Sequence, residues 1–183
     1  MGILLAFAPF FVYVVAARFT SIPVALGAAA ITSIALLARD AFGAGHSVKI
    51  LELGTLLLFG GLAIYAFVTH VSWSIPAVRL RVDLGLLFIV LVSLAIRKPF
   101  TLQYAREKVP TELWSSPEFL RTNDIITAVW AAAFAVMVAI DLAMLYVPAL
   151  TTRMAIIVTI LALYGAARFT AWYPERNKLN RTA

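Results

Sequence analysis

The feature that most constrains this chain is a series of apolar stretches that are too long to be one face of a globular core. They cover residues 3–17, 22–38, 50–69, 76–96, 125–147 and 149–172. A helix that crosses a bilayer needs about 20 predominantly apolar residues. Helices satisfy their own backbone hydrogen bonds, so they can cross lipid. The sequence therefore predicts an all-α polytopic membrane protein, a single domain of six transmembrane helices arranged as three hairpins.

The overall composition agrees with a lipid environment. Of 183 residues, 63% are hydrophobic and only 13% are charged, whereas a soluble domain carries about a quarter charged residues. The chain has no cysteine and only two histidines, and no catalytic motif or metal-ligand spacing is present. We therefore predict no enzymatic activity, no metal and no cofactor.

Two of the six stretches are weaker than the others. The first is short and contains Pro9, and we expect it to be a retained helix because no Lys or Arg precedes Arg18. The fourth begins with Arg79, Arg81 and Asp83, so it counts as a span only if the arginines reach the headgroups. We expect these three residues to form an interfacial cluster on the outer side. A weak site for anionic headgroups is the alternative.

The distribution of basic residues predicts the orientation. Of the 15 Lys and Arg residues, four lie on one side of the expected topology: Arg18, Arg79, Arg81 and Arg153. The remainder lie on the side that holds both termini, including a basic tail over residues 173–183. Cytoplasmic loops carry the excess of basic residues, so we place both termini in the cytoplasm of a bacterial inner membrane. This placement also makes nucleic acid an improbable partner.

The three expected hairpins share a short motif at their outer turns. Ile22-Pro23, Ile75-Pro76 and Val147-Pro148 each precede an apolar run that ends in arginine. Proline is well suited to the first turn of a helix. Common ancestry and convergence on the same turn chemistry both remain open.

The one substantial loop, residues 97–121, is predicted to be an amphipathic segment on the cytoplasmic membrane surface. Its basic side would face anionic lipid or a partner protein. The candidate surface comprises Arg97, Lys98, Pro99, Phe100, Tyr104, Arg106, Lys108 and Trp114.

The fifth stretch carries two patterns on opposite faces. A small residue recurs at every fourth position, which favours close helix packing or a homo-oligomer; the residues are Ala131, Ala135, Ala139 and Ala143. The other face carries Asp141, an acid at a depth where charge is costly. We expect an ion pair with Arg153 across the last hairpin. A proton or ion relay is the alternative.

Several short motifs resemble the bacterial intracellular septation protein A family. They are Arg97-Lys98-Pro99-Phe100, Trp114, Asn123 and Trp130, with Phe7-Ala8-Pro9-Phe10-Phe11, Arg79-Leu80-Arg81 and Tyr173-Pro174-Glu175 in support. The first hairpin departs from the family pattern at Arg18 and Thr20, as in a distant member. The resemblance implies a non-enzymatic inner-membrane protein of envelope maintenance and septation.

Three functions follow as hypotheses. The first is an interaction protein of the cell envelope that contacts lipid and division proteins. The second is a small transporter, channel or lipid-handling protein that uses Asp141. The third is an accessory subunit of a larger membrane complex.

Overall fold

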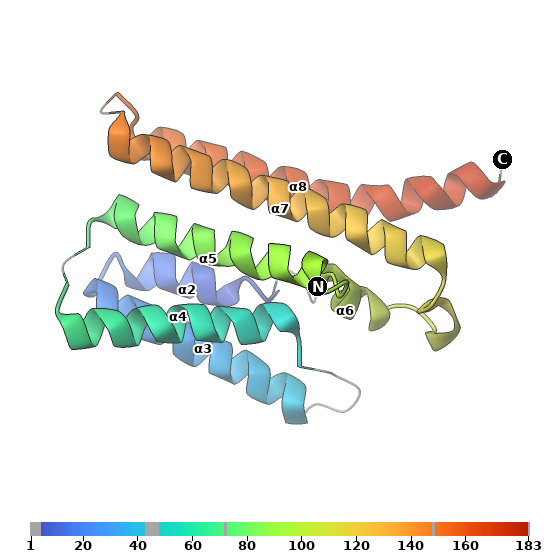
Figure 1. Cartoon of the computed structure of the whole chain (residues 1–183), viewed down its shortest axis with the longest axis horizontal. Coiled ribbons are helices and arrows are strands. Elements are labelled where there is room, and N and C mark those ends of the chain that lie inside the picture. Colours follow the sequence, from blue (N-terminus) through green and yellow to red (C-terminus); the bar gives the residue numbers. More distant parts are fainter. Residues whose placement is uncertain (1–4, 43–47, 72, 148, 183) are drawn as a thin grey trace. The chain divides into compact units, whose positions relative to one another are not determined.

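The computed structural model describes residues 5–42, 48–71, 73–147 and 149–182, and the regular elements of this part of the chain are all helices (Figure 1). In chain order the elements are α2 (Ala8–Ala16), α3 (Ile22–Phe42), α4 (Ile50–Thr69), α5 (Ile75–Ala95), α6 (Phe100–Arg106), the 3-10 helix η1 (Thr111–Leu113), α7 (Pro117–Tyr146) and α8 (Thr152–Thr182). They form two compact units, residues 1–75 and residues 76–183.

Four of the described helices are long and apolar enough to cross a membrane. They are α3, α4, α7 and the Thr152–Arg176 part of α8. Large apolar side chains on these helices are exposed, among them Ile31, Ile64 and Ile160. Exposed apolar residues of this kind are compatible with contact to lipid tails. The chain is therefore a helical membrane protein.

The first and fourth expected spans do not meet this standard. Helix α2 has only nine described residues, and Pro9 lies in its first turn instead of kinking its interior; residues 3 and 4 lie outside the described part. Helix α5 has 21 residues, and each of its ends lies one residue before the expected bound. However, Arg79, Arg81 and Asp83 interrupt its first half, and the remaining apolar stretch is too short to cross a membrane. Length and composition therefore support four spans instead of six.

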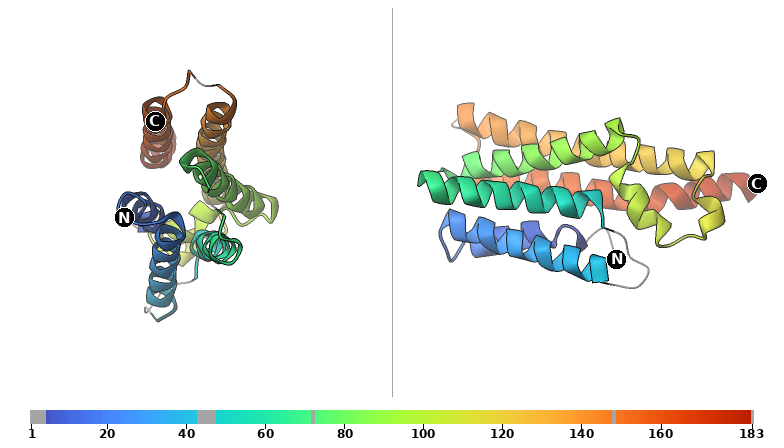
Figure 2. Two further views of the ribbon diagram at one scale, coloured as in Figure 1. Left: turned by 90° about the vertical axis from the view of Figure 1, so that its left-hand side faces the viewer. Right: turned by 60° about the horizontal axis from the view of Figure 1, so that its bottom comes forward.

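In the first unit, helices α2, α3 and α4 pack side by side (Figure 2). Helix α3 contributes the small residues Ala25 and Ala29, both fully buried, which let neighbouring backbones approach closely. The ring of Phe59 in α4 meets that of Phe10 in α2 edge-on, with centroids 4.8 Å apart. Aromatic pairs and small residues thus hold this unit together.

In the second unit, α7 and α8 form a helical hairpin (Figure 1); Pro148 in its turn lies outside the described residues. Helix α7 begins with a side-chain cap, because Ser116 accepts a hydrogen bond from the Phe119 N–H at 3.2 Å and Pro117 is the first helical residue. This cap explains why α7 begins eight residues before the apolar run at residue 125.

Helix α8 continues to Thr182 with Pro174 inside it, so residues 173–182 extend the helix.

Candidate functional site

The deepest charged group of the second unit is Asp141 in α7. Its side chain is fully buried, and its Oδ1 atom lies 3.2 Å from Nη2 of Arg79 in α5. The same Nη2 atom donates a hydrogen bond to Oγ1 of Thr159 in α8, also at 3.2 Å. Three helices of the unit thus meet at one guanidinium group.

The structure therefore gives Asp141 a basic partner, but not the expected one. Arg153 lies in the first turn of α8 and its side chain is exposed. Among the described residues, no ion pair is formed by Arg153. The expected pair was chosen because Asp141 and Arg153 lie at similar membrane depth in the last hairpin. The observed partner comes from a helix outside that hairpin.

The expected interfacial cluster of α5 divides into two faces. Arg79 and Asp83 are four residues apart and lie on the same face of the helix, and Asp83 is only 7% exposed. Arg81 is exposed on the other side, and its Nη1 atom donates to the carbonyl oxygen of Ala77. The four-residue spacing of Arg79 and Asp83 was the signal for this arrangement.

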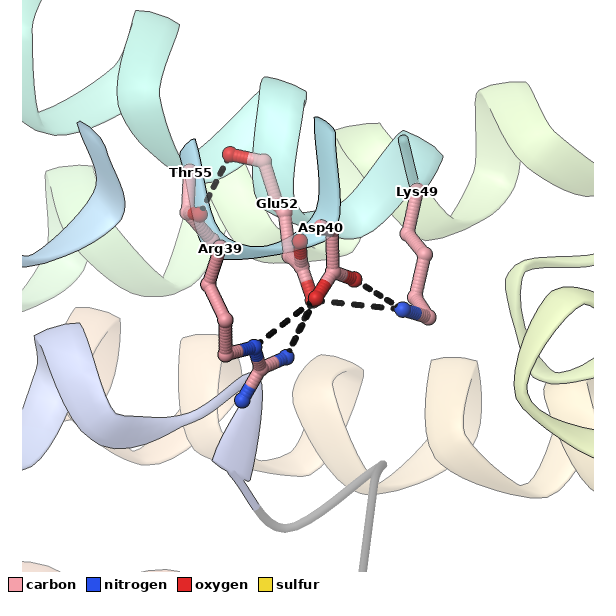
Figure 3. A network of polar contacts seen from close by, with 5 residues as sticks. All are labelled: Arg39, Asp40, Lys49, Glu52 and Thr55. Atoms are coloured by element: carbon pink, nitrogen blue, oxygen red, sulfur yellow. Dashed lines mark hydrogen bonds and ion pairs between the residues drawn. The ribbon is translucent and has the colours of Figure 1, made fainter. Parts of the chain in front are cut away.

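A second charged network closes the α3–α4 hairpin (Figure 3). Asp40 near the end of α3 is fully buried and accepts hydrogen bonds from both its neighbour Arg39, at 2.6 Å to Nη2, and Lys49 at the start of α4. Glu52 in α4 lies 3.9 Å from the Lys49 ammonium group and 4.0 Å from the Arg39 guanidinium group. Two acids and two bases thus form a cluster of zero formal charge.

Sequence reasoning missed this network. Arg39 and Lys49 count there only among the basic residues on the side of the termini, and no ion pair of theirs is predicted. The available signal was an acid and a base on each side of one short connection. Because buried charges persist only when paired, the two helix ends had to meet.

The predicted surface segment, residues 97–121, packs its apolar side into the second unit. Phe100 is fully buried, and its ring meets that of Trp130 in α7 edge-on. The hydroxyl group of Thr101 in α6 donates to the carbonyl oxygen of Asn123, at 3.0 Å, and lies 2.7 Å from the hydroxyl group of Thr127. Buried hydrogen bonds of this kind hold α6 against α7 at a defined register.

The basic pair at the start of this segment is held by the end of α5. The Lys98 N–H bonds to the carbonyl oxygen of Ser93, and the Arg97 N–H to that of Leu94, both at 2.9 Å. This is a Schellman cap, and Arg97 occupies its left-handed position with φ of 55°. Both basic side chains are exposed, whereas Pro99 is buried.

The other candidate residues of the segment also divide between an inner and an outer side. Tyr104 is buried, and Lys108 is exposed. The guanidinium group of Arg106 lies over the ring of Trp114, 5.3 Å from its centroid, and the indole N–H of Trp114 donates to the carbonyl oxygen of Val109. The candidate surface is therefore narrower than the sequence predicted, with Arg97, Lys98 and Lys108 as its exposed charges.

The alanine pattern of α7 does not face the protein interior along its length. Ala131 is buried, but Ala135 and Ala139 are exposed and Ala143 is half-buried. The buried face instead carries larger side chains, including Trp130 and Asp141. The indole N–H of Trp130 donates to Oγ1 of Thr170 in α8 at 3.0 Å, so aromatic packing and hydrogen bonding join this hairpin. The alanine pattern as a homo-oligomer interface stays a prediction.

Comparison with known proteins adds no relative: no family model, no curated protein and no solved structure matches this chain. In the part of the chain that the structure describes, no group of three or more His, Cys, Asp or Glu residues is placed to hold a metal ion. The two charged clusters and the 97–121 segment are therefore the candidate functional features.

Proposed function

We propose that this chain is a non-enzymatic protein of the bacterial inner membrane that supports septation or envelope maintenance through protein and lipid contacts. The observation that carries the proposal is the 97–121 segment. Buried contacts to α7 hold its inner side, while Arg97, Lys98 and Lys108 are exposed. The exposed pair Arg97 and Lys98 suits an acidic protein surface or anionic headgroups.

The proposal places both termini in the cytoplasm and embeds α5 in the membrane beside the four spans that length and composition support. Helix α5 has the length of a span, and two of its three charged residues are shielded from lipid, because Arg79 pairs with Asp141 and Asp83 is only 7% exposed. Charged residues in a membrane are tolerated when they face the interior of the helical bundle. The excess of basic residues on one side supports the orientation.

The motifs around Arg97-Lys98-Pro99-Phe100 support distant membership of the intracellular septation protein A family. In the structure, Phe100 and Trp130 from these motifs are in ring contact, and Asn123 accepts the Thr101 hydrogen bond through its backbone carbonyl. Residues of these motifs thus form the contact between α6 and α7. This supports reading the motifs as parts of one structural element.

Replacing both Arg97 and Lys98 by Glu tests this role. We expect recovery of division or wall-synthesis proteins to fall about tenfold or more, because two favourable charge contacts become repulsive. The measurement is a pull-down of the tagged protein in polymer-extracted native lipid, with mass spectrometry of proteins and lipids. Membrane insertion should not change, because both side chains are exposed.

The matched control replaces Arg168 and Arg176 by Glu, two exposed basic residues of α8. This variant should keep the partner profile of the natural sequence. An equal loss in both variants would show a general charge effect and contradict a specific docking edge. Stoichiometric recovery of an intact membrane complex would instead favour an accessory subunit.

A second candidate function is a small transporter or channel, favoured by the buried contact of Arg79 with Asp141. In proteoliposomes with a pH-sensitive dye inside, we expect Asp141→Asn to abolish ion flux. The control is Asp124→Asn, which changes an exposed acid on the same helix. Lack of flux in the unaltered protein, or equal flux in both variants, would reject this candidate.

A further inference from the structure

We propose that the first half of α5 is a conditional membrane segment, which lies in lipid only while Arg79 is held by Asp141 of α7 and Thr159 of α8. The inference rests on the proposed function in one respect, the placement of α5 in the membrane. The contact made by Arg79 then decides whether this half of the helix faces lipid or water.

The first step is the charge of this half of α5. Arg79, Arg81 and Asp83 interrupt it, and charged residues in a membrane either face the interior of a helical bundle or reach the headgroups. Asp83 is only 7% exposed. Arg81 is exposed, as a residue that extends toward the headgroups must be. Arg79 is therefore the charge whose surroundings depend on the neighbouring helices.

The second step is the contact itself, which is made by one guanidinium nitrogen. Nη2 of Arg79 lies 3.2 Å from Oδ1 of Asp141, and it donates to Oγ1 of Thr159, also at 3.2 Å. The Asp141 side chain is fully buried. Helix α7 is long and apolar enough to cross a membrane without this pair, whereas α5 is not. Loss of the pair should therefore displace α5 and leave α7 in place.

The second half of α5 is held in a different way. From Leu84 to Ala95 the helix carries no charged residue. Near its end, Oγ of Ser93 accepts a hydrogen bond from the N–H of Phe100, the first residue of α6, at 3.2 Å. The hydroxyl group of Thr101 in turn joins α6 to α7. This end of α5 stays attached without Arg79, so only the first half is conditional.

The test measures the water exposure of two positions on α5, with the full chain in lipid nanodiscs. The natural sequence has no cysteine, so Leu84→Cys and Leu91→Cys each introduce a single thiol. These leucines are 45% and 48% exposed, and they lie about two turns apart on one face of the helix. A charged maleimide labels thiols in water but not in lipid, and it reaches both sides of a nanodisc. The result is therefore independent of orientation.

We expect both thiols to be protected in the otherwise unaltered protein, relative to full labelling in a denaturing detergent. Asp141→Asn should raise the labelling of Leu84→Cys about fivefold or more and leave that of Leu91→Cys unchanged, because Arg79 then lacks its counter-charge. Adding Arg79→Leu to Asp141→Asn should restore protection, since the first half of α5 becomes more apolar. A general loss of folding is not repaired by a second substitution.

Two milder variants support the comparison. Thr159→Val keeps the ion pair and the size of the side chain but removes one hydrogen bond of Arg79. It should raise the labelling of Leu84→Cys about twofold. Asp124→Asn, at an exposed acid of α7, should leave the labelling unchanged.

Three outcomes overturn the proposal: protection of Leu84→Cys that persists in the Asp141→Asn protein, an equal rise in labelling at both thiols, and a failure of Arg79→Leu to restore protection. Labelling of both thiols in the otherwise unaltered protein overturns it together with the membrane placement of α5. Partner recovery with the Arg97 and Lys98 variant is measured separately, so the docking role and the conditional segment can fail independently.

Discussion

Replacing Asp40 by Asn is expected to lower the free energy of unfolding by about 3–5 kcal/mol, the usual effect of breaking a buried ion pair from one side. Asp40 accepts hydrogen bonds from both Arg39 and Lys49 and is fully buried. Its loss leaves two bases with Glu52 as their remaining acid, at 3.9 and 4.0 Å. Unfolding by a denaturing detergent, followed by tryptophan fluorescence, measures the change.

Two variants control this experiment. Asp124→Asn makes the same chemical change at an exposed position and should alter stability by no more than about 0.5 kcal/mol. Replacing Asp40 by Leu and Lys49 by Met together should recover most of the loss, because apolar residues can substitute for a complete buried pair. Equal stability of Asp40→Asn and Asp124→Asn would show that apolar packing alone holds the α3–α4 hairpin.

Replacing Trp130 by Ala is expected to destabilise the protein by about 3–5 kcal/mol, as large-to-small changes of buried aromatic residues do. The Trp130 side chain is almost completely buried and lies against the rings of Phe100 and Phe134. It also bonds to Thr170 across the α7–α8 hairpin. Both α6 and α8 should loosen from α7, which hydrogen exchange of the Thr101 and Thr170 regions would show.

Trp172→Ala provides the matched control. Trp172 is 45% exposed, and its ring lies under the guanidinium group of Arg176 at 4.9 Å. An exposed cation–π pair contributes about 0.5–1 kcal/mol, so the loss should be small. Trp130→Phe separates packing from hydrogen bonding, because it keeps most of the side-chain volume and loses a hydrogen bond worth about 1 kcal/mol. A Trp130→Ala effect no larger than that of Trp172→Ala would contradict the proposed core.

The structure agrees with the sequence most closely where the determining interactions are local. Helix α4 covers residues 50–69, the same bounds as the expected span, and Ser116 with Pro117 sets the start of α7. Apolar runs and cap residues act over a few neighbouring residues, so the sequence contains their full signal. Helix ends shifted where polar residues continued a helix beyond its apolar run, as at Asp40 in α3.

The charged pairs could not be predicted in the same way. Arg153 matched Asp141 in expected depth, but Arg79 is its partner. The choice depends on the rotation of each helix about its axis and on which helices are neighbours. Neither property is encoded by the hydropathy of a single segment. The same reason explains why the alanines of α7 could be recognised as a pattern without showing that Ala135 and Ala139 are exposed.

The sequence by itself therefore determined that this chain forms apolar helices for a membrane, because contiguous hydrophobicity is a local property with one stable solution in lipid. The tertiary structure decided which charged residues are buried away from lipid and which of them form ion pairs. It brought Asp40 to Lys49 across one connection, and Arg79 to Asp141 from a separate helix. Those pairings depend on lateral helix packing, which joins residues far apart in the chain.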